Sequence, residues 1–228
     1  MTDDRSITVW RLDLDACRKR VPVLLHLLSS DELQRASAFR LDIHRQWFIA
    51  CRAALRLILG AHLATRPYHL RFRYGPSGKP EIDSGGSEIR FNVSHTHGRA
   101  LIATAERFDV GVDIERQAPV LDWNRLSLLI FSDPERRELA ETADKPTAFL
   151  RGWTRKEAVL KAIGVGLTGS PTDLTVSLAQ KPVLITTLAG DRSPSDWSLI
   201  DLSGAAAVAA LAARVPHASV LLRTMDLS

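Results

Sequence analysis

The first segment of this 228-residue chain that could support chemistry is residues 110–115, Val-Gly-Val-Asp-Ile-Glu. Aliphatic residues alternate with small or acidic ones along it, which predicts a β-strand. Successive side chains of a strand point to opposite faces, so Asp113 and Glu115 share one face while the aliphatic side chains enter the core. Two carboxylates placed in this way can bind a hard cation. An isolated Asp-x-Glu segment on a strand more often simply faces solvent.

The second such segment is residues 153–164, whose pattern predicts a helix. Trp153, Glu157 and Lys161 follow at intervals of four residues and therefore lie along one stripe of that helix. On their own, Glu157 and Lys161 are typical of an exposed ion pair worth about 0.3–0.5 kcal/mol. Combined with the two carboxylates of the strand, they suit a cation such as Mg²⁺ bound next to a phosphate. Phosphoryl transfer is therefore our first hypothesis.

The charge of the chain is divided unevenly. Residues 1–108 contain 17 Lys and Arg against 11 Asp and Glu, a net of +6, whereas residues 109–228 contain 13 against 15, a net of −2. A basic half joined to an acidic half fits a polyanionic ligand on one side and a metal ion on the other. Chance asymmetry between two solvated surfaces explains the same numbers equally well.

The composition, with 45% hydrophobic and 25% charged residues, is that of a globular protein of one domain or two small ones. No apolar run approaches the ~20 residues that span a bilayer, and the polar, acidic start does not predict a signal peptide. Cys17 and Cys51 have neither metal-binding nor redox spacing, so we expect a cytoplasmic protein with reduced thiols and no membrane partner. The pI of about 9.4 admits nucleic acid, but no basic run or zinc-finger spacing supports that partner.

A long helix is predicted over residues 31–60. Ser29 or Ser30 can cap its N-terminus, and Gly60 is expected to end it. One face of this helix, opposite much of its apolar surface, carries three arginines: Arg45, Arg52 and Arg56. Such a stripe is most simply a solvated polar face, but it could also bind phosphates.

Strands and helices follow in blocks along the rest of the chain. Further strands are expected at residues 7–14, 88–93, 100–105, 174–178, 183–188, 197–202 and 219–223. Further helices are expected at residues 121–130, 133–141 and 148–163. Residues 205–213 are ambiguous, because alanine favours helix whereas the neighbouring strands favour β-structure. This order predicts an α+β fold with a pseudo-twofold arrangement of two similar α/β halves, residues 1–108 and 109–228, although no residue-level repeat is evident.

Taken together and in this order, the segments resemble the 4′-phosphopantetheinyl transferase superfamily, in its long single-chain type related to the surfactin-synthetase-activating enzyme. The matching motifs are Gly78-Lys79-Pro80, Phe91-Asn92-Val93-Ser94-His95, Gly111-Val112-Asp113-Ile114-Glu115 and Trp153-x-x-Lys156-Glu157-Ala158-x-x-Lys161-x-x-Gly164-x-Gly166-Leu167. The arginine-bearing helix also resembles the basic N-terminal helix of that family. The resemblance runs from about residue 7 to residue 190, and Trp-x-x-Lys-Glu is its most specific motif. Thr96 and His97 depart from it, since the family often has Ser-Gly there.

The resemblance implies an enzyme that transfers the phosphopantetheine arm of coenzyme A to a serine of an acyl, peptidyl or aryl carrier protein, releasing adenosine 3′,5′-bisphosphate. The residues implied to bind Mg²⁺ are Asp113, Glu115 and Glu157. Lys161 would contact the pyrophosphate, and Glu157 would accept the serine proton directly or through water. The residues implied to hold the coenzyme A phosphates are Arg45, Arg52, Lys79, Ser94 and His95. Coenzyme A would lie in a cleft between the two halves of a monomer.

Two other functions fit the same residues. A non-catalytic module that binds coenzyme A or a carrier protein would need neither the three carboxylates nor Lys161. A Mg²⁺-dependent phosphohydrolase would use water in place of the serine and would release adenosine bisphosphate without any carrier protein. Turnover with a carrier protein separates these functions, whereas the sequence does not indicate which biosynthetic pathway is served.

Overall fold

The computed structural model describes residues 5–75, 78–83, 87–118, 122–166 and 169–227. Its α-helices are α1 (Val21–Leu24), α2 (Ser30–Ser37), α3 (Asp42–His62), α4 (Trp123–Ile130), α5 (Asp133–Glu141) and α6 (Lys145–Ile163). Its strands are β1 (Ser6–Asp13), β2 (Phe72–Tyr74), β3 (Pro80–Ile82), β4 (Ile89–Thr96), β5 (Arg99–Glu106), β6 (Val110–Arg116), β7 (Thr175–Val176), β8 (Leu184–Thr186), β9 (Ser198–Asp201), β10 (Ala207–Ala213) and β11 (Ser219–Thr224). The acidic start of the chain, the predicted helix start at Leu121 and the motif residue Leu167 lie outside the described residues.

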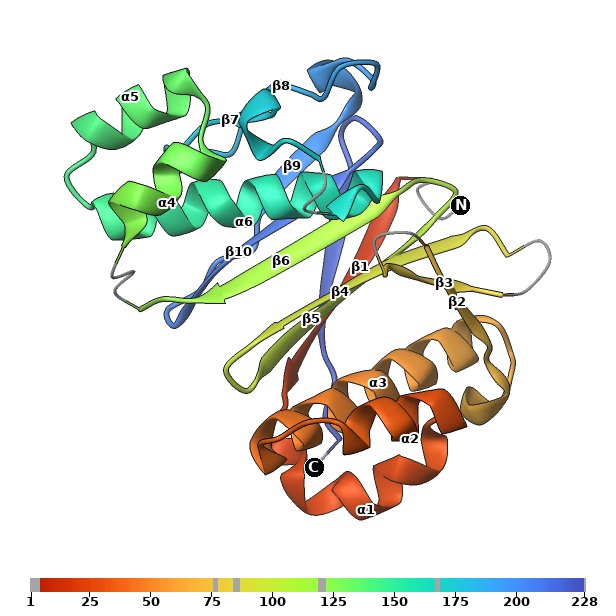
Figure 1. Cartoon of the computed structure of the whole chain (residues 1–228). Helices are drawn as coiled ribbons and strands as arrows, with labels where there is room; N and C mark the ends of the chain where they lie inside the picture. The colour runs from red at the N-terminus through yellow and green to blue at the C-terminus, as the bar shows by residue number, and fades with distance from the viewer. Residues whose placement is uncertain (1–4, 76–77, 84–86, 119–121, 167–168, 228) are drawn as a thin grey trace.

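Two sheets carry the fold (Figure 1). The first has the strand order β11-β1-β5-β4, and the second has the order β6-β10-β9. Neighbouring strands are antiparallel except β1 and β11, which run parallel from Ser6 opposite Ser219 to Arg11 opposite Thr224. Each strand predicted from the sequence is present, although β7 and β8 are shorter than expected.

The alanine-rich segment that was ambiguous in the sequence is a strand. It forms β10, the central strand of the second sheet, and all seven of its residues are buried. Ala209 faces the space between the two sheets, whereas Ala210 and Ala212 face α6. The helix propensity of alanine, an advantage of at most ~0.7 kcal/mol per residue over other ordinary residues, is outweighed because this strand is packed on both of its faces.

The sheets and the two long helices form four layers (Figure 1). α3 covers the outer face of the first sheet, and α6 covers the outer face of the second. The inner faces pack against each other, where Val9 of β1 and Val112 of β6 belong to the same core cluster. Among the described residues, none of the helices combines the length and the apolar character that crossing a bilayer requires.

The α+β class predicted from the sequence is confirmed, and the two sheets share a strand plan. The order β1-β5-β4 in the first sheet corresponds to β6-β10-β9 in the second, and one long helix packs on each. β11 departs from this plan, because the end of the chain returns to pair with β1. The twofold relation itself, and a boundary between residues 108 and 109, stay predictions.

The single long helix predicted over residues 31–60 is wrong, because the chain forms two helices there. α2 ends at Ser37 and α3 begins at Asp42. The predicted N-cap is confirmed: Ser29 and Glu32 form a capping box at the start of α2. The chain reverses after α2 so that Glu32 can reach Arg52, which one straight helix would hold about 30 Å away.

Gly60 also does not end its helix as expected. α3 continues to His62, and the left-handed backbone conformation follows at Ala64, with a φ of 49°. Gly60 instead permits a close approach, because a Cβ atom there would lie 2.7 Å from the carbonyl oxygen of Thr65. The glycine is therefore a packing requirement of the turn that follows the helix.

Two arginines of the predicted polar stripe of α3 are buried, which corrects the expectation of a solvated face. Arg52 Nε and Arg56 Nε each donate a hydrogen bond of 2.6 Å to the Glu32 carboxylate. Arg56 Nη1 also donates to the carbonyl oxygens of Pro67 and Leu70, at 2.8 and 3.0 Å. We call this cluster the first clamp, since it ties together α2, α3 and the 3₁₀ turn after α3.

A second clamp of the same design holds α6. Lys156 is fully buried, and its ammonium lies 2.6 Å from the Glu135 carboxylate of α5. The ammonium also donates to the carbonyl oxygens of Pro171, at 2.7 Å, and of Leu174. Glu135 in turn accepts the backbone N–H of Ser132 at 2.7 Å, which completes the capping box of α5. Burial lowers the pKa of Lys156, and the neighbouring Glu135 opposes that shift.

Candidate active site

The candidate site lies along the seam where β4 of the first sheet meets β6 of the second (Figure 1). Side chains of β4 bridge this seam: Asn92 Oδ1 accepts the N–H of Val112 at 3.0 Å, and Ser94 Oγ accepts the N–H of Ile114 at 3.3 Å. Asn92 and Ser94 therefore take the place that backbone carbonyl groups hold in a sheet. They also hold the two strands apart, which leaves room for charged side chains between them.

Asp113 is the centre of the site. Its carboxylate is buried, and Oδ1 lies 2.6 Å from the ammonium of Lys161 and accepts the hydroxyl of Ser94 at 2.9 Å. Lys161 Nζ also lies 3.2 Å from Ser94 Oγ. The structure thus brings together three residues predicted for the site, one each from β4, β6 and α6.

Glu115 and Glu157 complete the acidic group around Lys161. Burial raises the pKa of Glu115, and the charge of Asp113 raises it further, while a hydrogen bond from Trp153 lowers it. Burial also raises the pKa of Glu157, an effect that Lys161 opposes and the other two carboxylates reinforce. The three carboxylates are therefore close enough to repel one another, and each of the two glutamates takes up a proton more readily than a free glutamate does.

Two oxygen atoms in this group have no hydrogen-bond partner among the described residues. They are Asp113 Oδ2 and Glu157 Oε1, and both are buried. Buried acceptors without a partner are costly, and a cation would satisfy them. No three His, Cys, Asp or Glu side chains of the described residues already converge on one metal position, however. The positive charge next to Asp113 is the Lys161 ammonium.

Close packing of α6 on β6 positions these groups. A Cβ atom at Gly111 would lie 2.0 Å from the carbonyl oxygen of Ala158 and 2.5 Å from the backbone nitrogen of Ala162, so only glycine fits. The second clamp fixes the same helix through Lys156, one residue before Glu157. The structural roles of Gly111 and Lys156 were not predicted, although both residues stand in the motifs that carried the family resemblance.

The residues expected to bind phosphate lie at different distances from this centre. His95 is exposed next to Ser94, and the surrounding protein lowers its pKa by desolvation, with further contributions from Lys161, His44 and Arg35. Arg45 is exposed on the first turn of α3 and is paired with Asp42. Arg52 is bound within the first clamp, so its guanidinium is not brought to the Asp113 group.

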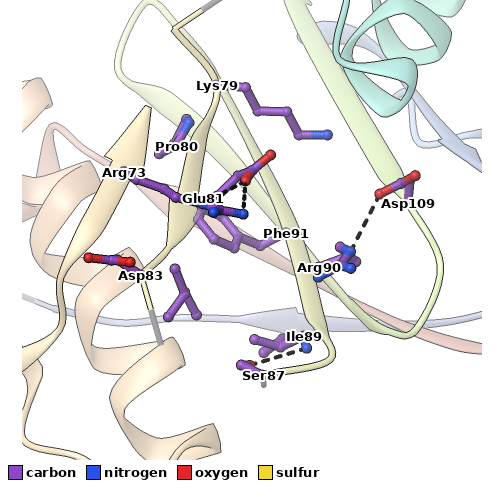
Figure 2. Close-up of a pocket in the computed structure, with 11 residues that line it drawn as sticks. Arg73, Lys79, Pro80, Glu81, Asp83, Ser87, Ile89, Arg90, Phe91 and Asp109 are labelled. Atoms are coloured by element: carbon purple, nitrogen blue, oxygen red, sulfur yellow. Dashed lines mark hydrogen bonds and ion pairs between the residues drawn. The ribbon is translucent and has the colours of Figure 1, made fainter. Parts of the chain in front are cut away.

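Lys79 approaches the site from its other side. Its ammonium donates to the backbone oxygens of Lys161 and Ala162, at 2.7 and 3.4 Å, at the C-terminal end of α6. A cation is favoured there by the helix dipole and by carbonyl groups without intrahelical partners. Desolvation lowers the pKa of Lys79. Lys79 lines a cavity of about 440 Å³, and Figure 2 shows Pro80 and Phe91 among the other lining residues.

Comparisons with known proteins agree with the motifs that meet at this seam. Residues 109–212, which include Asp113, Glu115, Glu157 and Lys161, match the 4′-phosphopantetheinyl transferase superfamily. The chain is 35% identical to the 4′-phosphopantetheinyl transferase HetI of Nostoc sp., over 86% of this chain and 82% of that protein. It is 26% identical to the L-aminoadipate-semialdehyde dehydrogenase-phosphopantetheinyl transferase of Schizosaccharomyces pombe, over 70% and 67% of the two chains. It is also 26% identical to the 4′-phosphopantetheinyl transferase psf-1 of Bacillus pumilus, over 77% and 74%.

Proposed function

The chain belongs to the 4′-phosphopantetheinyl transferase superfamily, and from that premise we propose how its own residues carry out the reaction. It is an enzyme that transfers the phosphopantetheine group of coenzyme A to carrier proteins, as the motif resemblance implied. The observation that supports our assignment of roles is the buried Asp113 carboxylate, bound by Lys161 and Ser94 where β4 and β6 meet.

In the proposed reaction, the serine hydroxyl of the carrier protein attacks the pyrophosphate phosphorus nearest to the pantetheine. The bond from this phosphorus to the bridging oxygen breaks, and adenosine 3′,5′-bisphosphate leaves. Glu157 accepts the serine proton, directly or through water, and its raised pKa suits this role. Lys161 donates to a pyrophosphate oxygen, for which its ammonium turns away from Asp113.

The residues proposed to bind Mg²⁺ are Asp113, Glu115 and Glu157. Their fit to a hard cation rests on two observations. Two buried oxygen atoms have no partner among the described residues, and burial together with the charge of the neighbouring carboxylates raises the pKa of both glutamates. Side-chain movement is needed before the three carboxylates can share one ion. Bound Mg²⁺ would neutralise the developing charge of the pyrophosphate.

We propose Ser94, His95 and Arg45 as ligands of the coenzyme A phosphates. Ser94 and His95 lie at the seam, and His44, which precedes Arg45 on the first turn of α3, is close enough to His95 to lower its pKa. Lys79 is a fourth proposed phosphate ligand, and its ammonium would give up the carbonyl oxygens at the end of α6 to bind the phosphate. The cavity beside Lys79 is large enough for the nucleoside of coenzyme A. Arg52 is left out of this set, because Glu32 already binds its guanidinium.

The protein partner in this proposal is an acyl, peptidyl or aryl carrier domain. One chain supplies both strands of the seam, so a monomer would contain a whole site. The exposed basic residues at the start of α3 would favour the approach of an acidic carrier surface.

The test is to incubate the protein with coenzyme A, Mg²⁺ and a panel of apo carrier domains and to measure the mass of each carrier. We expect a mass gain of one phosphopantetheine group on serine, together with equimolar adenosine 3′,5′-bisphosphate. Release of the bisphosphate without any carrier protein would show a phosphohydrolase instead. Binding of coenzyme A without turnover on any carrier would show a non-catalytic module. Omission of Mg²⁺ serves as the metal control.

A further inference from the structure

Five arginines from five separate segments line one cavity at the end of the molecule where β1, β4 and β6 begin. The cavity has a volume of about 340 Å³. Its arginines are Arg5 before β1, Arg90 on β4, Arg107 between β5 and β6, Arg192 before the 3₁₀ turn Pro194–Asp196, and Arg214 directly after β10. Neither the transfer reaction nor the family motifs use any of these residues.

Among the described residues that line this cavity, five are arginines and one is acidic. Ion pairs within the described residues join Arg90 and Arg214 to Asp109, Arg107 to Glu88, and Arg214 also to Asp191. Of these acidic residues, only Asp109 lines the cavity among the described residues, and Figure 2 shows it facing Arg90. Asp109 lies 3.6 Å from Arg90 Nε and 3.7 Å from Arg214 Nη1, which are ion-pair distances too long for hydrogen bonds. These guanidinium groups therefore keep donors that a stronger acceptor could use.

The backbone at Arg107 gives a second, independent observation. Its φ is 69°, in the left-handed region that favours glycine and is costly for a residue with a side chain. A glycine would make the turn between β5 and β6 without this cost, yet an arginine stands there. Strained backbone positions cluster at functional sites, and Arg107 lines this cavity.

We propose that this cavity binds an anion that carries at least two phosphate groups. The planar fork of a guanidinium group matches a phosphate. The arginines come from five segments around the cavity, so a chain of phosphates can contact more of them than one phosphate can. Arg90 lies four residues before Ser94 on β4, and Asp109, directly before β6, lies four residues before Asp113. This spacing places the cavity about 13 Å from the transfer site. The proposal is therefore independent of the assignment of transfer roles.

Binding at this cavity would also stabilise the fold. Arg5, Arg90 and Arg107 come from the first sheet and its connections, whereas Arg192 and Arg214 come from the segments around β9 and β10. A polyphosphate that contacts both groups would link the two sheets at the end opposite to Glu115. A ligand that binds only the folded state raises its melting temperature.

The test uses tripolyphosphate as the probe in metal-free buffer, with orthophosphate as the comparison. Titration calorimetry and thermal unfolding are measured for the unmodified chain, for Arg192→Ala and for the double variant Arg90→Ala/Arg192→Ala. Arg137→Ala, which removes an exposed arginine from α5, is the matched control. Lys161→Ala separates this cavity from the transfer site.

We expect tripolyphosphate at a hundredfold excess over its dissociation constant to raise the melting temperature by about 5–10 °C. Arg192→Ala should weaken binding about tenfold and the double variant at least a hundredfold, while Arg137→Ala and Lys161→Ala bind normally. If the unmodified chain does not bind tripolyphosphate, or if Lys161→Ala rather than the arginine variants removes binding, the proposal is wrong. Arg192→Ala alone decides the matter if the double variant does not fold.

Discussion

The three strands β1, β5 and β4 have two edges, and each edge meets a further strand in a different way. β11 lies next to β1 at one edge, and β6 lies next to β4 at the other. β1 and β11 are joined by a continuous parallel ladder of backbone pairs over six residues of each strand. β4 and β6 are joined by the side chains of Asn92 and Ser94, which accept backbone N–H groups of β6. At the second join, the charged groups of Asp113 and Lys161 both contact Ser94 of β4. Replacing backbone acceptors by short side chains therefore opens a sheet edge enough to build a site.

The two clamps teach the same lesson at the level of helices. In each, a buried cation of a long helix binds the glutamate of a capping box and two carbonyl oxygens that flank a 3₁₀ turn. Arg56 and Lys156 are 100 residues apart, as are Ala64 and Gly164, both with positive φ. With the same offset, Glu157 corresponds to Leu57 and Lys161 to Ala61. The framework is common to both helices, and the reactive side chains are confined to one.

The largest effect should come from removing the charge of Glu157. Glu157→Gln keeps the shape of the side chain but cannot accept the serine proton, so turnover should fall by ~10²–10⁴. Leu57→Gln, at the corresponding position of α3, is the matched control and should leave turnover unchanged. Steady-state rates are measured over a range of Mg²⁺ and Mn²⁺ concentrations. Full recovery at high metal concentration would show that Glu157 is a metal ligand only.

Removing the buried cation should lower the unfolding free energy more in the second clamp than in the first. Lys156→Met leaves Glu135 buried without a charged partner, which should cost ~3–5 kcal/mol of unfolding free energy. Arg56→Met should cost less, because Arg52 still binds Glu32. Urea unfolding of both variants measures the difference. Equal losses, or a loss below about 1 kcal/mol for Lys156→Met, would contradict the account of the clamps.

His95 and Arg45 should bind the 3′-phosphate of coenzyme A. His95→Ala and Arg45→Ala should each lower kcat/KM for coenzyme A about ten- to hundredfold, because a charge-assisted hydrogen bond to the phosphate is lost. The preference of the enzyme for coenzyme A over 3′-dephospho-coenzyme A should decrease accordingly. Lys161→Ala should slow both donors alike, since both contain the pyrophosphate. The ratio of kcat/KM values for the two donors is the measurement. An unchanged ratio in both variants would place the 3′-phosphate elsewhere, with Arg35 and Arg40 the next residues to test.

The preference for coenzyme A should also depend on pH. Desolvation lowers the pKa of His95 in the free protein, so its imidazole is neutral at neutral pH and gains charge only as the pH falls through that lowered value. The preference over the dephospho donor should therefore increase toward acidic pH in the unmodified enzyme. His95→Ala is the control and should show no such increase. The 3′-phosphate itself takes up a proton at about pH 6, so the two proteins are compared with each other. An equal pH dependence in both would exclude His95 as a phosphate ligand.

The smallest effect concerns Lys79. Removing its cation from the end of α6 with Lys79→Met should lower the unfolding free energy by ~0.3–1 kcal/mol. If Lys79 also turns to a phosphate, the same variant should raise the KM for coenzyme A. Arg71→Met, which changes an exposed arginine directly before β2 and outside the lining of the cavity beside Lys79, is the control for local damage. A loss of stability with an unchanged KM would show that Lys79 stabilises the end of α6 but does not bind coenzyme A.

The sequence predicted the local elements of the site well, because strand alternation and helix spacing are read within a few residues. Asp113 and Lys161 were expected to meet, and they do. The break before α3 could not be predicted in the same way, since it depends on Glu32 reaching Arg56 across 24 residues. The repeat of the two clamps was also missed, because it is carried by contacts between distant residues of different types. Its only local signal was the pair of Ser-x-x-Glu capping boxes.

Asp113→Ala tests most directly whether the reaction takes place at the β4–β6 seam. The variant removes a buried carboxylate, but Glu115 and Glu157 stay near Lys161 and the repulsion among the carboxylates is relieved. Its melting temperature should therefore stay close to that of the unmodified chain. The measurement is the rate of phosphopantetheine transfer to an apo carrier protein at ordinary Mg²⁺. We predict a loss of at least ~10²-fold in a folded protein, because a metal ligand and the partner of Lys161 are gone. Near-normal transfer by Asp113→Ala would contradict the account.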